Sequence, residues 1–326
     1  MPTAPRPGRR TTNSGWPAAA GLAAGLAADA LLGDPRRGHP VAGFGSVAAG
    51  LERRAHRDSR LVGAAYSASL TAGTALLGAA AVAGRGPGPR LVLTAVATWA
   101  VVGGTSLRRE AAVMSRLLEA GDLDAARARL SHLCGRDASR LDVAGLTRAT
   151  VESVAENTSD AVVGPLVWGA VGGVPGLLAY RAANTLDAMV GHRSPRHERF
   201  GWAAARTDDV ANLLPARLCA ALTVACAPLV DGRSRAALRA WRRDGHKHPS
   251  PNAGPVEAAF AGALGRTLGG RLAYGGRVEE RPLLGDGPAP EVADIARAAR
   301  LSAAVTVSAG VIAVGARLLL DRAAAR

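Results

Sequence analysis

Carboxylates recur every four residues in the segment VESVAENTSD (151–160). In a helix, Glu152, Glu156 and Asp160 would line one face, because four residues make just over one turn. Like charges at this spacing repel one another and destabilise a helix. A solvated acidic face is one explanation, but the segment leads directly into an apolar run. Hard cations bind carboxylate oxygens, so we predict that Glu156 and Asp160 are Mg²⁺ ligands.

Three more segments place polar residues beside apolar runs. The loop DALLGDPRRGHP carries the candidate residues Asp34 and His39, although Asp34 could instead cap a helix. The candidates in the other two segments are Asn184 and Asp187 of YRAANTLDAMVG, and Arg206, Asp208, Asp209 and Arg217 of RFGWAAARTDDVANLLPARL. Exposed charge near a membrane surface is the alternative, but polar groups this dense at membrane depth are usually functional.

The segment HKHPSPNAG (246–254) contains the only lysine of the chain. Arginine does not replace lysine where a compact ammonium must fit a site. Two prolines fix an extended path and NAG supplies a tight turn, which predicts a cradle for a phosphate or carboxylate. The side chains presented by this loop and by the following helix EAAFAGALG are Lys247, His248, Ser250, Asn252 and Glu257. We expect Lys247 to contact the bound anion, and chance in an arginine-biased composition is the alternative.

The composition favours a membrane protein over a nucleic-acid-binding protein. Hydrophobic residues make up 48% of the chain although 20% is charged, so apolar and charged stretches must alternate. Aromatic residues are only 3%, and the remaining small apolar residues suit close helix packing in lipid. The net charge of +14 comes without a recognisable DNA-binding motif, and basic cytoplasmic loops explain it.

The apolar stretches predict an all-α, polytopic integral membrane protein with about four to six transmembrane or re-entrant helices. Four stretches approach the length of a spanning helix, and they lie near 16–33, 61–83, 91–107 and 301–320. Prolines and arginines interrupt 161–182 and 210–230, which fits broken or re-entrant helices as well as full spans. No repeat and no alternating-strand pattern is found. We expect a basic tail, 1–15, and one membrane-embedded domain, 16–326.

The basic residues indicate the orientation of the chain. Most lie in 34–60, 108–160 and 231–300, which share one side whether or not both interrupted stretches cross. The positive-inside rule assigns that side to the cytoplasm. The segment 183–212 lies on the same side or on the opposite one, depending on whether the interrupted stretches cross. Apolar residues at helical spacing in EAAVMSRLLEAGDLDAARARLSHL predict helices in the second of these loops.

Read together, the motifs resemble the cobinamide-phosphate synthase family of cobalamin biosynthesis (CobD/CbiB). The matching stretches are GDPRRGHPV, ESVAENTSDAVVGPLVWGAVGGVPG, AYRAANTLDAMVGHR, RFGWAAARTDDVANLLPARL, KHPSPNAG, EAAFAGALG and RPLLGDG, and their order covers roughly residues 26 to 320. Each piece alone is weak and the combination is specific. The chain departs from the family pattern after the first HPV and after NAG, which affects local packing more than activity.

The resemblance implies an ATP-dependent, Mg²⁺-using ligase of the cell membrane with its active site facing the cytoplasm. Such an enzyme joins the free carboxylate of adenosylcobyric acid to (R)-1-amino-2-propanol or its O-phosphate by an amide bond, giving adenosylcobinamide or its phosphate. On this basis the candidate metal ligands are Glu156, Asp160, Asp208 and Asp209. The candidate clamps for phosphate or carboxylate are Lys247, Arg206 and Arg217, and the candidate general bases are His248 and His39. The remaining candidates for substrate binding are Asp34, Asn157, Asn184, Asp187, Ser250, Asn252 and Glu257.

Two other functions stay open at this point. A transporter of a small anion or metal would also place polar residues in broken helices, but it predicts internal repeats. A non-catalytic scaffold for membrane-bound cobalamin enzymes would explain the spans but not the charged constellations. The expected partners are the two substrates, the lipid bilayer and other membrane-bound enzymes of cobalamin biosynthesis, without nucleic acid.

Overall fold

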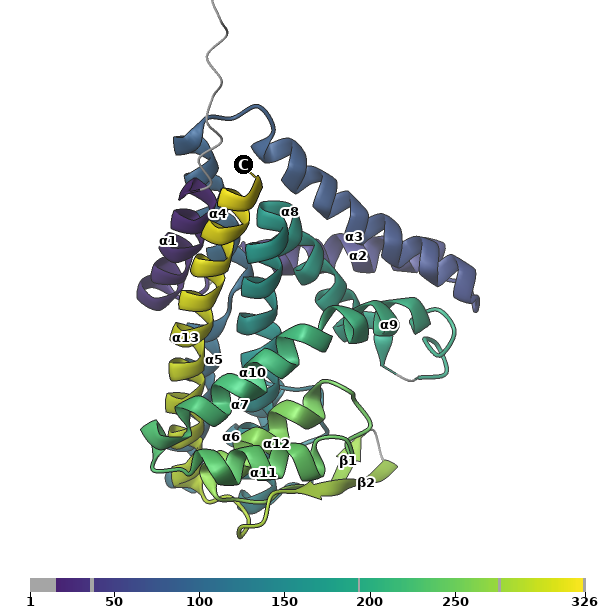
Figure 1. Ribbon diagram of the computed structural model, residues 1–326. Coiled ribbons are helices and arrows are strands. Elements are labelled where there is room, and N and C mark those ends of the chain that lie inside the picture. The colour runs from purple at the N-terminus through teal and green to yellow at the C-terminus, as the bar shows by residue number, and fades with distance from the viewer. Residues whose placement is uncertain (1–15, 36–37, 193, 275–276, 325–326) are drawn as a thin grey trace, which may run out of the picture.

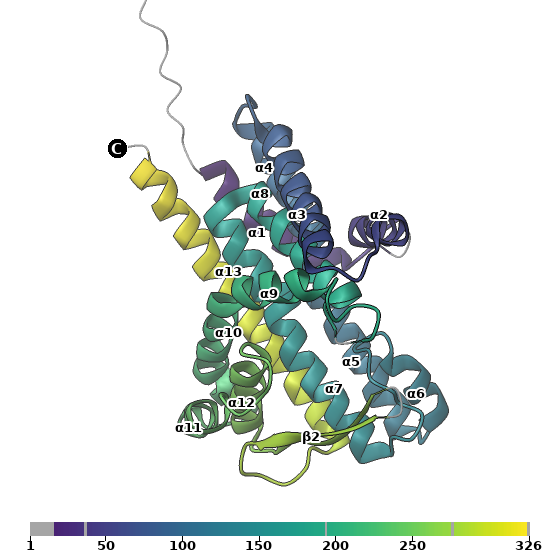
Figure 2. The ribbon, with the colours of Figure 1, turned by 90° about the vertical axis from the view of Figure 1, so that its right-hand side faces the viewer.

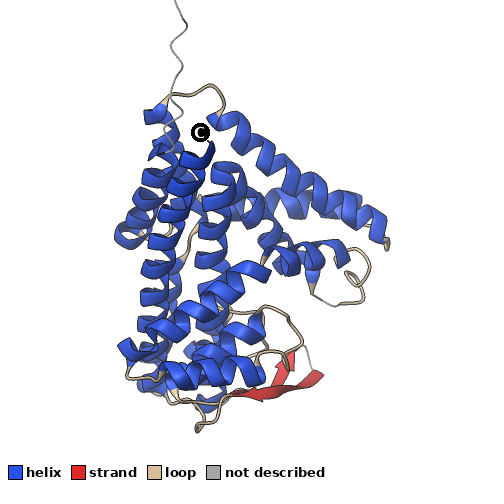
Figure 3. Ribbon diagram, viewed as in Figure 1, coloured by secondary structure: helices blue, strands red, loops and turns tan. Residues whose placement is uncertain are grey.

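Long apolar helices form one end of the molecule, and shorter helices with a β-hairpin form the other (Figures 1 and 3). The computed structural model describes residues 16–35, 38–192, 194–274 and 277–324. Within these residues, five helical segments are long and apolar enough to cross a membrane, and they are Arg60–Val82, Pro87–Glu119, Val143–Gly191, Leu213–Val230 and Val292–Ala324. A shorter apolar helix is Trp16–Leu32. The chain is thus an all-α, multi-pass membrane protein, as the sequence predicts.

The helices at the upper end of Figure 1 pack through small residues. They are α1 (Trp16–Leu32), α3 (Arg60–Val82), α4 (Pro87–Val101), α8 (Gly164–Leu186) and the upper half of α13 (Val292–Ala324). A Cβ atom at Gly21 or Gly25 of α1 would lie 2.5 Å from Thr94 Cβ or 2.4 Å from Thr98 Cβ of α4. The segment GLAAG therefore brings two backbones together as GxxxG motifs do in membranes.

Helix α13 is longer than the hydrocarbon core of a bilayer is thick. Its 33 residues extend about 50 Å, whereas the hydrocarbon core is about 30 Å thick. The stretch 301–316 has no charged residue, Arg297 and Arg300 precede it, and Arg317 follows it. The beginning of α13 must therefore project from the membrane, together with the short elements packed around it.

Helix α8 is a hairpin of two legs. Gly173 has the left-handed φ of 60°, and a proline follows at position 175. A Cβ atom at Gly164 would lie 2.1 Å from the hydroxyl oxygen of Tyr180, so the legs run back against each other. Arg317 donates from Nη1 to the carbonyl of Ala170 at 3.2 Å, which satisfies an acceptor at the end of the first leg.

This reversal decides the side on which 183–212 lies. The second leg of α8 returns the chain to the end of the bundle where α2 (Pro40–Ala55) and α9 (Trp202–Ala211) lie (Figure 1). Glu52 of α2 accepts a hydrogen bond from Arg196 at 3.1 Å and contacts His197 Nε2 at 3.1 Å. The segment 183–212 thus joins the side of the basic loop 34–60.

The lower end consists of α5 (Gly104–Glu119), α6 (Leu123–Leu130), α7 (Val143–Thr158), α10 (Leu213–Cys226), a 3₁₀ turn (Ala227–Val230), α11 (Ser234–Asp244) and α12 (Ala253–Leu264). Helices α5 and α6 confirm the helical prediction for their segment. Figure 1 shows α10 running across α13 rather than alongside it. The apolar stretch 210–230 therefore packs over the base of the bundle instead of paralleling α13.

A β-hairpin of β1 (Leu268–Tyr274) and β2 (Arg277–Leu284) closes this end. The strands are antiparallel, and Leu268 pairs with Leu284. This small sheet leaves the fold all-α, but its strands were not detected in the sequence. A Gly-Gly pair between two short runs is a hairpin signal, but two glycines at the start of β1 and few apolar residues obscure the alternation.

Candidate functional site

Three aspartates meet where the legs of the α8 hairpin begin and end. Asp160 lies in a π-helical segment, Ser159–Val163, that leads into α8, and Asp187 opens a second, Asp187–Gly191, that leaves it. Asp208 comes from α9. We call these three residues the aspartate cluster. Asp160 and Asp187 both experience the negative charge of Asp208, and π-helical turns occur frequently at functional sites.

Polar neighbours of the aspartate cluster come from α8. Asn184 donates from Nδ2 to Asp208 Oδ1 at 3.3 Å. Arg181 lies within electrostatic range of Asp160 and of Asp34, so the loop after α1 reaches the same site. Tyr180 donates from its hydroxyl to Asn212 Oδ1 at 2.7 Å and lies 3.1 Å from the carbonyl oxygen of Asp160.

The aspartate cluster combines excess negative charge with incomplete burial. Burial raises the pKa of Asp208 to about 6, and neighbouring carboxylates add to the rise. The side chains of Asp160 and Asp187 are half-buried, and the side chain of Glu156 on α7 is exposed. Protein atoms therefore leave Asp160 and Asp187 partly uncovered, whereas Asp208 is buried.

The loop at residues 33–39 is fixed between α1 and α2. The Asp34 backbone N–H donates to Ser106 Oγ at 3.3 Å. His39 is the N-cap of α2, because its Nδ1 accepts from the Val41 backbone N–H at 3.2 Å; the alternative capping role for Asp34 thus falls to His39. His39 Nε2 lies 3.8 Å from Asp34 Oδ1, an oxygen with no hydrogen-bond partner among the described residues.

A second group, which we call the glutamate cluster, comprises Glu152, Glu156 and Glu257. Arg136 donates to Glu152 Oε2 at 2.7 Å, and the Gly269 backbone N–H donates to Glu152 Oε1 at 2.8 Å. Burial raises the pKa of Glu257 well above its ordinary value, and the charges of the other two glutamates add to this. Glu156 also interacts with the aspartate cluster, so it connects the two groups.

His248 forms one wall of the glutamate cluster. Its Nδ1 lies 3.0 Å from the Ser250 backbone nitrogen, and Arg281 Nη1 lies 2.9 Å from its Nε2. Arginine can only donate, so Nε2 is the acceptor in this contact. Burial, followed by the charge of Arg281, lowers the pKa of His248 to about 4. His248 is therefore a weak base in this structure.

Lys247 is paired with a buried aspartate. Its Nζ donates to Asp244 Oδ1 at 2.8 Å, and Asp244 also accepts from Arg243 and from the backbone N–H of Gly285. We call Asp244 and these three donors the Asp244 hub. The hub joins the HKHPSPNAG loop to the LLGDG turn. The predicted contact of Lys247 with a substrate anion is not tested by this arrangement.

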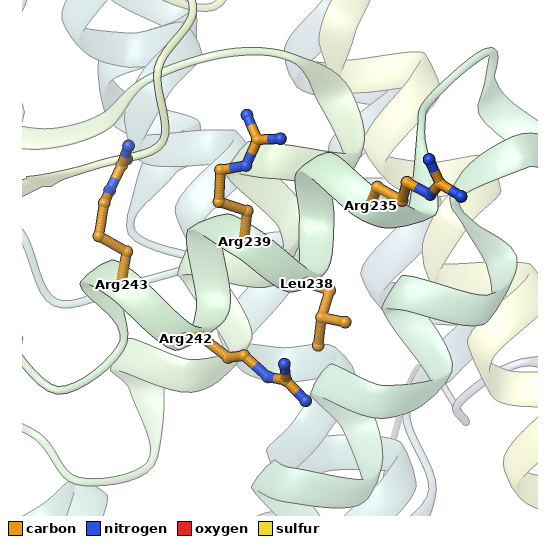
Figure 4. A pocket seen from close by; sticks show the side chains of 5 residues that line it. All are labelled: Arg235, Leu238, Arg239, Arg242 and Arg243. Carbon is orange, nitrogen blue, oxygen red and sulfur yellow. The ribbon is translucent and has the colours of Figure 1, made fainter.

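Two hollows flank α11. One, of about 470 Å³, lies beside the HKHPSPNAG loop and is lined by Arg217, Trp241, Arg242, Gly245, His246, His248, Pro249, Pro251 and Pro255. The other, of about 490 Å³, is lined by Arg235, Leu238, Arg239, Arg242 and Arg243 (Figure 4). Neither lining contains a carboxylate. In the lining of the first hollow, Arg217 donates to Asn252 Oδ1 at 2.8 Å and so connects α10 to the HKHPSPNAG loop.

Some predicted residues lie outside the two clusters. Asn157 donates to the carbonyl of Ser153 at 2.9 Å and is turned toward Leu133. Arg206 is exposed and pairs with Asp209 at 3.2 Å. The residues missing from the predicted site are Tyr180, Arg181, Arg136 and Arg281. An arginine inside an apolar stretch is the signal for Arg181, whereas nothing local marks Arg136.

The donor groups suit magnesium bound together with phosphates. In the part of the chain that the structure describes, no three His, Cys, Asp or Glu side chains are arranged to hold a metal ion. Mg²⁺ commonly uses only one or two protein carboxylates, with substrate phosphates and water completing its shell. The half-buried Asp160 and the buried Asp208, which lie within electrostatic range of each other, fit that pattern.

Comparisons with known proteins point in one direction. A family model described as CobD/Cbib protein matches residues 22–302. The chain is 55% identical over 296 residues to "Cobalamin biosynthesis protein CobD" of Mycobacterium tuberculosis, covering 91% of this chain and 95% of the relative. It is 46% identical over 285 residues to the protein of that name from Chromobacterium violaceum, covering 85% and 89%. For Rhodobacter capsulatus the identity is 41% over 310 residues, covering 91% and 98%. No solved structure matches.

Proposed function

This chain belongs to the CobD/CbiB family of cobalamin biosynthesis proteins, and on that premise we propose that it is an ATP-dependent amide ligase whose site faces the cytoplasm. Its substrates are the free side-chain carboxylate of adenosylcobyric acid and (R)-1-amino-2-propanol or its O-phosphate. The observation that carries the proposal is the aspartate cluster beside Arg181, where segments carrying the family motifs come within electrostatic range of one another.

The reaction needs an activated acyl group, because a carboxylate is a poor electrophile. A carboxylate oxygen of the corrinoid attacks the γ-phosphorus of ATP, and ADP leaves. The amine nitrogen then attacks the carbonyl carbon of the acyl phosphate, inorganic phosphate leaves, and a base takes the proton from nitrogen. Catalysis of such steps consists mainly of holding the reactants and stabilising negative charge on the phosphoryl oxygens.

The aspartate cluster supplies the place for a cation in this chemistry. Asp160 and Asp208 would hold Mg²⁺, with Glu156 and Asp209 as further candidates. The ion neutralises charge on the phosphates when it is bound. Arg181, in electrostatic range of Asp160 and Asp34, orients these carboxylates and faces the anionic reactant.

The hollow beside the HKHPSPNAG loop is the proposed place for a phosphate-bearing reactant. Its cationic and titratable residues are Arg217, Arg242, His246 and His248, and it contains no carboxylate. Asn252 and Ser250 shape its rim, because Asn252 accepts from Arg217 and Ser250 Oγ accepts from the Ala253 backbone N–H at 3.1 Å. Its volume of about 470 Å³ lies in the usual range for small-molecule sites.

The environment of His248 argues against it as the proton acceptor for the amine, which leaves His39 as the remaining candidate. His248 is neutral, with a pKa lowered to about 4 by burial and by Arg281, so it takes up a proton poorly near neutral pH. His39 Nε2 instead lies 3.8 Å from Asp34 Oδ1. The side chains of His39 and Asp34 are both partly exposed, as a substrate-binding pair must be.

The experiment is a product assay on the purified protein in lipid nanodiscs. Cobyric acid, the amine and ATP should yield the amide with one ADP per amide, detected by mass spectrometry and a coupled ADP assay. Both forms of the amine should be supplied in separate reactions. Amide formation without ATP, or ADP formation without amide, would refute the ligase. Nanodiscs enclose no compartment, so a transporter or a scaffold would give no product.

A further inference from the structure

Helix α2 lies at the edge of the molecule with most of its surface uncovered. Ala48 is the only fully buried residue of this helix. Tyr66 of α3 holds it by donating from its hydroxyl to the Ala48 carbonyl at 2.9 Å. Glu52 holds the other end through Arg196 and His197. The helix is thus attached along one narrow stripe, and the rest of its circumference faces the surroundings.

The neighbours of α2 confine it to the level of the membrane surface. It follows α1, which ends at Leu32, and it precedes α3, which begins at Arg60. Four residues separate α2 from α3, and an extended chain of that length reaches at most about 14 Å. Helix α2 lies crosswise to α13, lengthwise in Figure 1 and end-on in Figure 2. A helix bounded by two apolar helices and turned across them runs along the bilayer surface.

The uncovered part of α2 has an apolar stripe and a polar stripe. Val47 is 58% exposed and Leu51 is 40% exposed, and together with the half-buried Phe44 they recur at the spacing of one helix face. Ser46 and Arg53 are exposed on a different side, whereas Arg54, seven residues after Val47, ends the apolar stripe at the basic end of the helix. Exposed apolar and basic residues on one in-plane helix are typical of interfacial helices.

An aromatic residue marks the same level on the neighbouring helix. Trp202, at the start of α9, is 44% exposed, and the guanidinium of Arg60 lies 5.5 Å from its ring centroid. Tryptophan gathers at the boundary between lipid tails and headgroups. The beginning of α3 and the beginning of α9 therefore indicate the same membrane boundary beside α2.

We propose that α2 is an in-plane helix that binds the lipid surface on the side of the basic loops. Val47 and Leu51 enter the boundary of the acyl chains, and Arg53 and Arg54 pair with the phosphates of anionic lipids. The occupant is the bilayer in which the protein sits, because the spans on both sides of α2 continue directly into it. His39, the N-cap of α2, and the loop with Asp34 then lie at headgroup level.

The test uses spin labels and no measure of activity, so it is independent of the ligase proposal. The three native cysteines, Cys134, Cys219 and Cys226, are first replaced by alanine. Single cysteines are then placed at Val47, Leu51 or Ser46 and labelled in nanodiscs of phosphatidylcholine with phosphatidylglycerol. Accessibility to oxygen, which concentrates in lipid, is compared with accessibility to a water-soluble nickel chelate. Ser46→Cys is the matched control on the polar stripe.

We expect an oxygen-to-nickel accessibility ratio about threefold larger at Val47 and Leu51 than at Ser46. In R53Q/R54Q the difference should shrink when the nanodiscs contain the anionic lipid and stay unchanged in pure phosphatidylcholine. Equal ratios at the three positions would mean that α2 faces water. Exclusion of both reagents at Val47 and Leu51 would mean that another protein surface covers the stripe. Either result overturns the proposal, and two reporter positions guard against one misfolded variant.

Discussion

Two buried carboxylates in this molecule, Asp244 and Asp208, differ in what surrounds them. Asp244, 1% exposed, accepts from Lys247, Arg243 and the Gly285 backbone N–H. These donors hold its pKa well below the ordinary value against the effect of burial. Asp208 of the aspartate cluster accepts from Asn184 at 3.3 Å, and burial raises its pKa.

The difference separates a structural carboxylate from one prepared for a ligand. In the Asp244 hub the protein supplies the positive charge, so the site is complete and two loops are joined. In the aspartate cluster like charges are held together at a cost in stability, and a cation from outside would relieve it. The comparison predicts opposite effects of the same chemical change in the two places.

The largest effect is expected for Asp160→Asn. Neutralising one carboxylate removes a predicted ligand, so turnover should fall on the order of a hundredfold to a thousandfold. Relief of repulsion should leave the melting temperature unchanged or higher. Asp124→Asn on α6, where the side chain is 95% exposed, is the matched control and should resemble the wild type. Full activity in Asp160→Asn would remove this residue from the site.

Tyr180→Phe should have an intermediate effect. Unlike the two aspartate variants, it should lower both stability and turnover. The change leaves the Asn212 Oδ1 acceptor without its donor in a buried position, which should cost about 1 to 2 kcal/mol of stability. Because Tyr180 also lies against Asp160, we expect turnover to fall about tenfold. The loss should appear in kcat, with KM for both substrates unchanged, since Tyr180 acts through its neighbours. An unchanged kcat would make Tyr180 structural only.

Asp244→Asn should show the reverse of Asp160→Asn. Loss of the charge weakens contacts to two cations, so we expect about 2 kcal/mol less stability in thermal unfolding and turnover close to the wild type. The pKa of Asp244 is lower in the folded state, so its stabilisation is present above about pH 4, the unfolded value. It is lost as the pH falls below that value. The stability gap between wild type and variant should therefore begin to narrow near pH 5 and keep narrowing as the pH falls toward the folded-state pKa, which lies well below the unfolded value.

Lys247→Arg should have the smallest effect. Lys247 is 44% exposed and pairs with Asp244, and an arginine can keep that pair, so the cost should stay below about 1 kcal/mol in stability. The hub explains a cation at this position without a substrate contact. A tenfold or larger fall in kcat at unchanged melting temperature would instead assign Lys247 to the substrate, as its uniqueness in the sequence suggests.

Local sequence patterns identified the segments that carry the site residues. They did not identify which residues those segments contact in the fold. Asp34, Asp187 and Asp208 stand out because they interrupt or border apolar runs, and local patterns carry that information. The bond from the Gly269 backbone N–H to Glu152 and the approach of Arg281 to His248 depend on a hairpin folding over α7, which no local pattern specifies. The GGVPG run marked a possible break, but only the packing of Gly164 against Tyr180 shows that the chain turns back.

The hairpin of α8 also has a consequence for the order in which the protein assembles. Asp160, Arg181 and Asp187 are brought together by one local reversal of the chain, and contacts of short sequence separation form fastest. Chains emerge from the ribosome amino-terminal end first, so this half of the site would exist before α9, the HKHPSPNAG loop and the β-hairpin are made. A nascent chain at that stage carries an acidic group at the membrane without the residues that cover it. Ligand-binding competence would then appear abruptly, late in synthesis, when the last third of the chain folds onto the base of the hairpin.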